Sequence, residues 1–484
     1  MTPQTNPHHA RRWAILAVLG IAQLMVVLDA TIVNIALPSA QRSLEFSDES
    51  RQWVVTAYAL AFGSLLLLGG RIGDLFGRKR VFIAGLLGFA VASAIGGAAE
   101  SFGVLVASRA LQGVFGALLA PAALSLLTTT FTEPAERAKA FGIFGAIAGG
   151  GAAIGLLLGG VLTEYLSWRW CLYVNLLFAI PAALFAFSLL VNQVPAHRPR
   201  LDVPGTLTAT TGLLALVYGF SHAETSSWGD SLTIALLAAS AVLLIAFVAI
   251  QRRSSHPLLP LRIVLDRGRG GAYLAMGIAG AGMFGVFLFL TFYLQNTLGY
   301  SPIESGLAFL PMSAAIIATA TTATTRLVPR IGAKPLVMTG MALASVAMVL
   351  FAQLHVDSGY ALHILPGLVI LGVGLGLVFA PAFSTATLGV EPSDAGVASA
   401  MVNTSQQVGG SVGTALLSTL AGSAVTSYMA ENGPDTAAAA AVHGYTTAFY
   451  WSAAIFALGV VVSAIVFRAG APAVAPDAEP VMAH

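Results

Sequence analysis

Apolar stretches of about 20 residues, separated by short segments with charge, Pro or Gly, run through almost the whole chain. An α-helix of that length crosses the hydrocarbon core of a bilayer. Only 9% of the 484 residues are charged, against about 25% in soluble domains, which leaves too few charges to cover a soluble surface. Because helices satisfy their own backbone hydrogen bonds in lipid, the sequence predicts an all-α membrane protein.

Counting the apolar stretches predicts fourteen transmembrane helices, the first over 13–37. Lys and Arg indicate the orientation, since they concentrate on the cytoplasmic side of membrane proteins. With the N-terminus inside, nineteen of the twenty-three basic residues fall in cytoplasmic segments. Arg42, Arg51 and Arg169 fall outside, and Arg109 lies within a helix. We therefore predict a multi-pass protein of a bacterial inner membrane with both termini in the cytoplasm.

A weak internal repeat divides the chain into two related halves. The segment 70–79 recurs in degraded form at 325–334, and Pro121 with its flanking alanines recurs at Pro381. The repeat leaves two helices between the halves. The predicted division is a cytoplasmic N-terminal tail (1–12), a six-helix half (13–192), a linker with two inserted helices (193–251), a second six-helix half (252–468) and a disordered cytoplasmic tail (469–484).

Two ionisable residues lie deep inside predicted helices, Asp29 in the first and Arg109 in the fourth. A charge at the bilayer centre costs at least about 2.5 kcal/mol, so such residues are functional candidates. From the helical rise, both lie about 10–12 Å below the outer surface, and we expect them to pair. Asp29 would stay ionised beside Arg109 and take up a proton in apolar surroundings. The pair is predicted to be a proton switch; a static ion pair between helices is the alternative.

Glycines and amide side chains mark two further candidate regions. A stripe of small residues on the fifth helix permits close contact with another helix, and either packing alone or a moving interface explains it. The stripe consists of Gly151, Gly155, Gly159 and Gly160. Amide side chains within helices either line a substrate cavity or hydrogen-bond between helices. The candidates for the cavity are Asn34, Gln112, Gln295, Asn403 and Gln407.

Several kinds of site are missing from the sequence. It has no G-x-x-x-x-G-K-[ST] loop, which argues against direct ATP coupling in this chain. The single Cys171 and the scattered histidines provide no ligands at metal spacing, so no metal is expected. No set of a nucleophile, a general base and a general acid lies at a common depth in the predicted helices, so no catalytic site is expected. We predict no enzymatic activity, no catalytic residues, no cofactor and no nucleic-acid partner, with the proton gradient as energy source.

Several motifs resemble those of the major facilitator superfamily and, more narrowly, of its fourteen-helix drug:proton antiporters. The segment 28–38 is similar to that family's helix 1 signature, and Trp168-Arg169-Trp170 with Asn175 resembles its segment leading into helix 6. The helix 4 motif is matched by Arg109, Gln112, Gly113 and Gly116. The superfamily's loop 2–3 motif is matched by Gly70, Asp74, Gly77, Arg78 and Lys79. The resemblance covers nearly all of the chain between residue 11 and Arg468.

This resemblance implies the major facilitator fold, with two six-helix halves and two inserted helices. It also implies that Asp29 is the proton-binding acid and Arg109 its partner. The residues of the loop 2–3 motif would form a conformational lock between the halves on the cytoplasmic side, with Asp74 near the start of the thirteenth helix. Leu156 stands where the antiporters have a proline in helix 5, so proton symport stays open as an alternative.

We predict a proton-coupled exporter (an antiporter) of lipophilic small molecules such as drugs, working by alternating access as a monomer in the bilayer. A single cavity acid favours a monocationic or neutral substrate over a dication. A dedicated exporter of one endogenous metabolite is the nearest alternative. A non-transporting membrane sensor or scaffold is a remote one.

Overall fold

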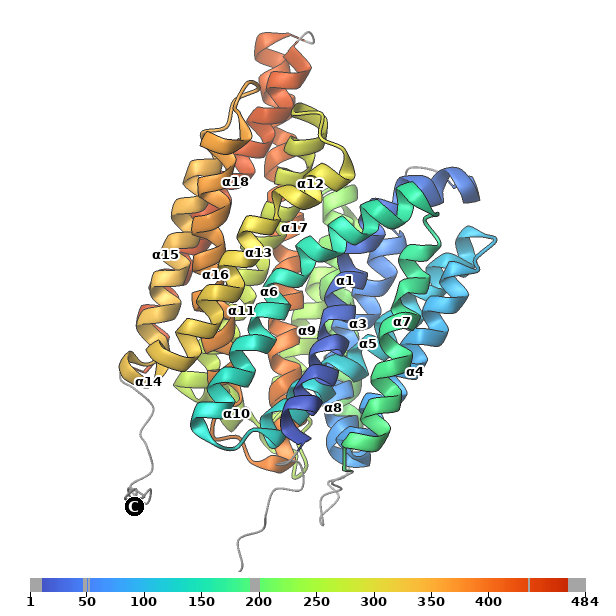
Figure 1. Cartoon of the computed structure of the whole chain (residues 1–484), viewed down its shortest axis with the longest axis vertical. Coiled ribbons are helices and arrows are strands. Elements are labelled where there is room, and N and C mark those ends of the chain that lie inside the picture. The colour runs from blue at the N-terminus through green and yellow to red at the C-terminus, as the bar shows by residue number, and fades with distance from the viewer. Residues whose placement is uncertain (1–10, 47–49, 51–52, 192–200, 434–435, 469–484) are drawn as a thin grey trace, which may run out of the picture.

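The computed structural model describes residues 11–46, 50, 53–191, 201–433 and 436–468 (Figure 1). Within these residues the chain is helical and contains no strand. Thirteen of the described helices are long and apolar enough to cross a membrane. The prediction of an all-α membrane protein is therefore confirmed. Residues 1–10 and the tail 469–484 lie outside the described residues.

Helix α6 (Pro134–Tyr165) leaves the number of membrane spans open. It is not among those thirteen, although its 32 residues exceed the roughly 20 that cross a bilayer. The count of fourteen spans therefore stays a prediction.

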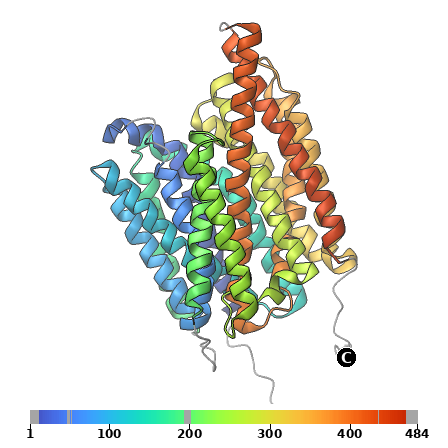
Figure 2. The same ribbon diagram turned by 180° about the vertical axis from the view of Figure 1, so that it is seen from behind.

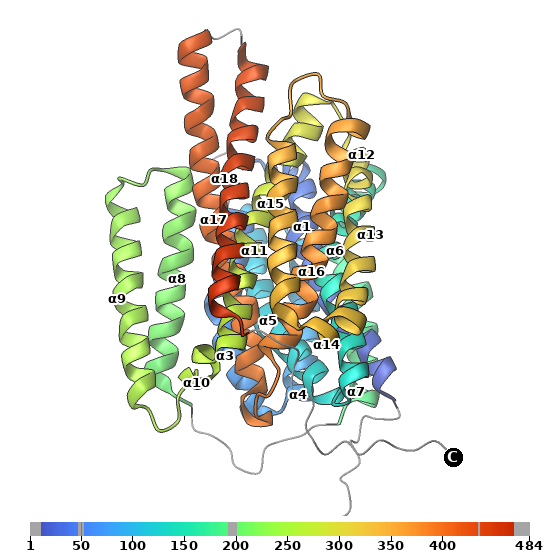
Figure 3. The ribbon, with the colours of Figure 1, turned by 90° about the vertical axis from the view of Figure 1, so that its left-hand side faces the viewer.

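The helices form two groups with a separate pair beside them. In Figure 1 the first group lies on the right and the second on the left. Figure 2 shows α8 and α9, in green, in front of the other helices, and Figure 3 shows them standing together at the edge of the bundle. The first group comprises α1 (Arg12–Leu44), α3 (Trp53–Phe76), α4 (Arg78–Gly97), α5 (Phe102–Thr130), α6 and α7 (Trp170–Leu189). The pair comprises α8 (Val203–Thr225), which contacts α3 and α17, and α9 (Ser231–Arg253).

The second group contains the remaining long helices, some of which are interrupted by π-helical turns. The short α10 (Leu261–Leu265) leads into it. Its elements are α11 (Arg267–Phe292), η2 (Tyr293–Thr297), α12 (Pro302–Ala308), α13 (Leu310–Thr322), η3 (Ala323–Leu327), α14 (Val328–Ile331), α15 (Ala333–Phe351), η4 (Tyr360–Ile364), α16 (Leu365–Ala386), η5 (Pro392–Asp394), α17 (Ala395–Asn432) and α18 (Ala437–Val466).

Polar caps show why several helices begin where they do. The first N–H groups of a helix have no partner within it, so a side-chain oxygen placed there is stabilising. The carboxylate of Asp230 accepts two backbone N–H groups at the start of α9, and that of Asp266 does the same for α11. Ser301 and Glu304 form a capping box at the start of α12.

Helix α1 is longer than expected. The sequence predicted its end near Leu37, but it continues through Pro38 to Leu44. Proline in a helix interior removes one hydrogen bond and often ends the helix, and here the packing of α1 outweighs that effect. The helix end predicted near Leu37 is therefore wrong, and the depth estimated for Asp29 stays a prediction.

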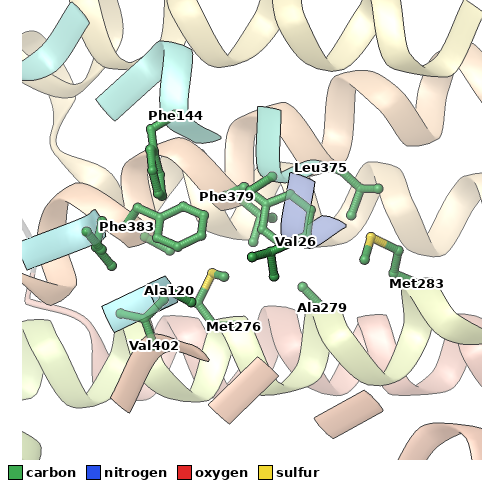
Figure 4. Close-up of a cluster of buried hydrophobic side chains, with 14 of the residues drawn as sticks. Val26, Ala120, Phe144, Met276, Ala279, Met283, Leu375, Phe379, Phe383 and Val402 are labelled. Carbon is green, nitrogen blue, oxygen red and sulfur yellow. The ribbon is translucent and has the colours of Figure 1, made fainter. Parts of the chain in front are cut away.

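A buried apolar cluster joins the two groups (Figure 4). Phe144 of α6 meets Phe383 of α16 edge to face, with ring centroids 5.8 Å apart. Of the other members labelled in Figure 4, Val26 and Ala120 come from the first group, and Met276, Ala279, Met283, Leu375, Phe379 and Val402 come from the second. The two groups thus share one core instead of meeting only at their ends.

Helices α3 and α5 cross most tightly at Gly69, where an added Cβ would overlap the carbonyl oxygen of Ala117. Gly69→Ala is therefore expected to cost about 1–3 kcal/mol of stability, seen as a lower thermal unfolding midpoint of the purified protein. Gly73→Ala is the matched control on the same helix, because nothing lies within 4 Å of a Cβ at Gly73. Equal losses in the two variants would contradict this prediction.

Candidate functional site

Asp29 of α1 and Arg109 of α5 form a buried ion pair. The Nη1 of Arg109 lies 2.6 Å from the Oδ2 of Asp29, and the two side chains are 1% and 0% exposed. The structure thus brings together the two intramembrane charges that the sequence singled out.

Neutral polar side chains complete the surroundings of the Asp29 carboxylate. Gln112 Nε2 donates to Asp29 Oδ1 at 2.8 Å, and Asn175 Nδ2 donates to the same oxygen at 2.7 Å. Both amides also donate to the hydroxyl of Ser93, at 2.7 Å and 3.3 Å. Hydrogen bonds from α5 and α7 therefore converge on one carboxylate.

Arg109 has partners besides Asp29. Its Nε donates to the carbonyl oxygen of Val54 at 3.1 Å, and its Nη1 also donates to Oε1 of Gln112 at 2.7 Å. The guanidinium lies over the ring of Tyr58, 4.5 Å from its centroid. Contacts of this cation–π type are worth about 0.5–2 kcal/mol. The guanidinium is thus fixed by α1, α3 and its own helix.

Sequence reasoning missed Ser93 and Tyr58, because a lone hydroxyl or phenol in an apolar helix carries no recognisable signal. Asn175 entered only through the resemblance to a family motif. Gln112 was expected to line a cavity, whereas the structure places it, fully buried, between Arg109, Asp29 and Ser93.

A second polar cluster lies at one end of the bundle, the basic end, formed by residues 70–80, 134–139, 261–269 and 387–396. Here α3 passes so close to α17 that a Cβ on Gly70 would lie 2.5 Å from the carbonyl oxygen of Gly396. The backbone N–H of Gly396 donates to Oδ1 of Asp74 at 3.1 Å. A carboxylate is stabilised at the N-terminus of a helix. Asp74 thus contacts the start of α17.

The other residues of the loop 2–3 motif have separate positions. Gly77 turns the chain between α3 and α4 with a φ of 93°, a conformation that favours glycine. Arg78 Nη2 lies 3.0 Å from Oδ1 of Asp74. Lys79 points away from the second group: its Nζ donates to the carbonyl oxygen of Phe187 in α7 at 2.7 Å. Within the structure, Lys79 therefore binds its own half.

Two arginines converge on Asp394, which precedes α17. Arg71 of α3 lies 3.8 Å from its Oδ1, and Arg262 of α10 lies 2.5 Å from its Oδ2. Burial raises the pKa of Asp394 above its ordinary value, while Arg262 and Arg71 act in the opposite direction. Sequence analysis assigned Arg71 and Arg262 no role beyond indicating orientation. In the structure, their ion pairs with Asp394 connect α3 and α10 to the start of α17.

Arg137 of α6 also connects the two groups. Its Nη2 donates to the hydroxyl of Thr387 after α16 at 2.9 Å, and its Nη1 donates to the carbonyl oxygen of Thr128 in α5 at 3.3 Å. Burial lowers the pKa of Arg137 to about 10, so the guanidinium stays charged at neutral pH. The basic end is therefore held by contacts from α3, α6 and α10.

The glycine stripe of α6 faces α1. Added Cβ atoms on Gly151, Gly155 and Gly159 would meet residues 24–32 of α1, the segment that carries Asp29. Gly160 is buried beside them. Leu156 is also buried, and α6 continues through it without interruption.

The remaining cavity candidates are scattered. Asn403 donates to the carbonyl oxygen of Ser399 in its own helix at 3.1 Å, and Gln407 packs against Gly63 of α3. Gln295 lies in the π-helical turn η2, with its Nε2 buried and without a hydrogen-bond partner. The side chain of Asn34 lies outside those described. A surface groove of about 690 Å³ between the ends of α8 and α9 is lined by other residues.

Comparisons with known proteins extend these observations. The family model described as Major Facilitator Superfamily matches residues 19–414. The puromycin resistance protein pur8 of Streptomyces alboniger is 50% identical over 457 residues, which cover 94% of this chain and 91% of that protein. The cephamycin export protein CmcT of Amycolatopsis lactamdurans is 41% identical, covering 85% of each chain.

Two further matches point the same way. The lincomycin resistance protein of Streptomyces lincolnensis is 37% identical, covering 84% of this chain and 83% of that protein. The crystal structure of the human organic anion transporter MFSD10 matches with a TM-score of 0.64 at 16% identity, covering 94% of this chain and 99% of that one. At that identity the structural match supports the fold alone.

Proposed function

The chain belongs to the Major Facilitator Superfamily, and from this premise we propose that it is a proton-coupled exporter of small lipophilic molecules. The family and fold predicted from the sequence are confirmed, and the chain is a multi-pass membrane transporter. Export, the coupling to protons and the identity of the coupling residues belong to the proposal.

One observation carries the proposal: Asp29, fully buried, pairs with an equally buried Arg109. A buried ion pair stabilises a fold poorly compared with apolar packing, so its presence inside a membrane calls for a functional explanation. Asp29 binds a proton when Arg109 or the surrounding helices move away, and releases it when the pair reforms. The static ion pair is the competing interpretation.

The substrate class follows from the relatives. Their names record resistance to puromycin and lincomycin and export of a cephamycin. We infer that this chain exports an antibiotic-like small molecule, with puromycin as the first compound to test because pur8 is 50% identical. Whether one compound or many are exported separates a dedicated exporter from a multidrug one.

Transport proceeds by alternating access in this proposal. The basic end faces the cytoplasm of a bacterium, because Lys and Arg concentrate there. Gly70 and Asp74 hold the halves together at that end, and Arg71 and Arg137 add contacts across the same boundary. Arg78 pairs with Asp74 within the first half. The glycine stripe of α6 lets α1 slide, which moves Asp29 relative to Arg109.

The test measures luminal pH in proteoliposomes, with puromycin, lincomycin or a cephamycin added outside and a pH-sensitive dye inside. Antiport predicts that inward substrate movement makes the lumen more alkaline, whereas symport predicts acidification. The Asp29→Asn variant is expected to give no proton signal. If wild type and Asp29→Asn respond equally, Asp29 is structural and the proton route proposed here is wrong. If no compound moves protons in the wild type, proton-coupled export of these compounds is wrong.

A further inference from the structure

In the side-chain amide of Asn175 the nitrogen donates hydrogen bonds, whereas the oxygen accepts none. Its Nδ2 donates to Asp29 Oδ1 at 2.7 Å and to Ser93 Oγ at 3.3 Å. Its Oδ1 is buried without a hydrogen-bond partner, in a side chain that is only 1% exposed. A buried acceptor without a partner is unfavourable. The Oδ1 of Asn175 is thus an acceptor without a partner next to Asp29, the candidate proton site, and we look for a state of Asp29 that would give it one.

Gln112 provides the contrast. Its Nε2 donates to Asp29 and Ser93, just as the amide of Asn175 does, but its Oε1 accepts a hydrogen bond from Arg109 Nη1 at 2.7 Å. Both ends of the Gln112 amide are bonded, so its orientation is fixed. Only one end of the Asn175 amide is bonded, so its orientation depends on Asp29 and Ser93 alone.

Protonation changes what Asp29 requires of its neighbours. An ionised carboxylate only accepts hydrogen bonds, whereas a protonated carboxylic acid also needs an acceptor for its O–H group. Arg109 can only donate, and the Gln112 oxygen is already engaged by Arg109. Of the described side chains that hydrogen-bond to Asp29, Asn175 is the one with a free acceptor.

A half turn of the amide about the Cβ–Cγ bond of Asn175 would present this oxygen to Asp29. On the side of the amide that faces away from Asp29 and Ser93, the rotation replaces an unpartnered oxygen by an unpartnered NH₂, so no hydrogen bond is lost there. The Ser93 hydroxyl fits both orientations because it can donate or accept. The orientation of the Asn175 amide therefore depends on whether Asp29 is protonated.

We propose that Asn175 is a positioning residue whose side-chain amide turns over when Asp29 binds a proton. It donates to the Asp29 carboxylate when Asp29 is ionised and accepts from the Asp29 O–H when Asp29 is protonated, and Asn175 itself never takes the proton. This inference rests on the proposed function, in which Asp29 carries the proton. Among the described residues, the other titratable groups that interact electrostatically with Asp29 are Arg109, Tyr58 and Cys171, and neither Tyr58 nor Cys171 is hydrogen-bonded to it.

The experiment follows protonation of Asp29 by infrared difference spectroscopy of the purified full-length protein, without substrate, as the pH is changed. The carboxyl band is assigned by its loss in Asp29→Asn. Gln112→Leu removes a fixed donor to the charged form and should raise the midpoint of protonation by about one to two pH units. Asn175→Leu removes a donor and an acceptor together, so its midpoint should move by less than about 0.5 pH unit.

Two further measurements keep the test decisive if Asn175→Leu does not fold. Asn175→Thr places a hydroxyl that can donate and accept, and is expected to keep the wild-type midpoint. In the wild type, the side-chain carbonyl band of Asn175, identified by its absence in Asn175→Thr, should shift when Asp29 is protonated. A midpoint shift in Asn175→Leu as large as that in Gln112→Leu, or a carbonyl band that does not respond to pH, would overturn the proposal.

Failure of the proposed function would look different. In that case both bands respond to pH as expected, but no substrate moves protons in proteoliposomes. If substrate moves protons and the Asp29 carboxyl band never appears, the inference about Asn175 is overturned while coupled transport stands.

Discussion

Arg109→Leu is expected to destabilise the protein by about 3–5 kcal/mol and to abolish coupled transport. The substitution leaves the Asp29 carboxylate, 0% exposed, without the charge that lies 2.6 Å away in the structure. Breaking one side of a buried ion pair costs more than the pair itself contributes, because an uncompensated charge remains in a medium of low dielectric constant. The loss is measured as a fall in the denaturation midpoint of the purified protein and as absence of substrate-driven proton movement.

The double variant Asp29→Leu with Arg109→Leu is the control for this prediction. It removes both charges, and Gln112 and Asn175 keep Ser93 as a hydrogen-bond acceptor, so most of the lost stability should return. Transport should not return, since the proton-binding group is gone. A single variant as stable as wild type would show that the pair is not buried as described. Transport by the double variant would remove Asp29 from the coupling mechanism.

Gly70→Val is expected to hold the basic end open and to reduce transport strongly. A Cβ at this position would lie 2.5 Å from the carbonyl oxygen of Gly396 and 2.8 Å from the Cβ of Ala400, both on α17. The clash lies between the two groups of helices, so separating them relieves it without unfolding either group. A penalty of about 1–3 kcal/mol on the closed arrangement lowers its population relative to the open one about 5- to 150-fold.

The measurement uses spin labels on cysteines introduced at Phe76 and Leu388, which are exposed at the basic end on opposite sides of the boundary. The single native Cys171 is buried and can be replaced by alanine in the background. The distance between labels should lengthen in Gly70→Val and stay unchanged in Gly73→Val, since a Cβ at Gly73 meets nothing within 4 Å. Unchanged distances in both variants would show that this contact does not control opening.

The membrane character of the chain and its family could be predicted from the sequence. Each apolar stretch encodes its own helix, because a helix in lipid forms its hydrogen bonds locally and needs no distant partner. The isolated charges Asp29 and Arg109 stood out for the same reason: a charge among apolar residues is costly wherever the helix packs. Local physical chemistry thus sufficed for the element type and for two residues of the candidate site.

Neighbours that come together only through packing could not be predicted in this way. Ser93 and Tyr58 reach the Asp29–Arg109 pair from α4 and α3, and nothing in their local sequence distinguishes them from ordinary helix residues. The end of α1 was misplaced because Pro38 is a helix-breaking signal, which tertiary packing overrides.

The polar contacts at the basic end could not be predicted from the sequence either, because packing brings their partners together. Lys79 sits within the loop 2–3 motif, yet it binds α7, while Arg71 and Arg262 meet at Asp394 from segments far apart in the chain. Local sequence was enough to predict which segments are helical, that they lie in a membrane, and which charges are too costly to occur without a role. The side chains that satisfy those charges became visible only in the folded protein, because a hydrogen bond depends on positions within a few tenths of an ångström, and packing between helices sets those positions.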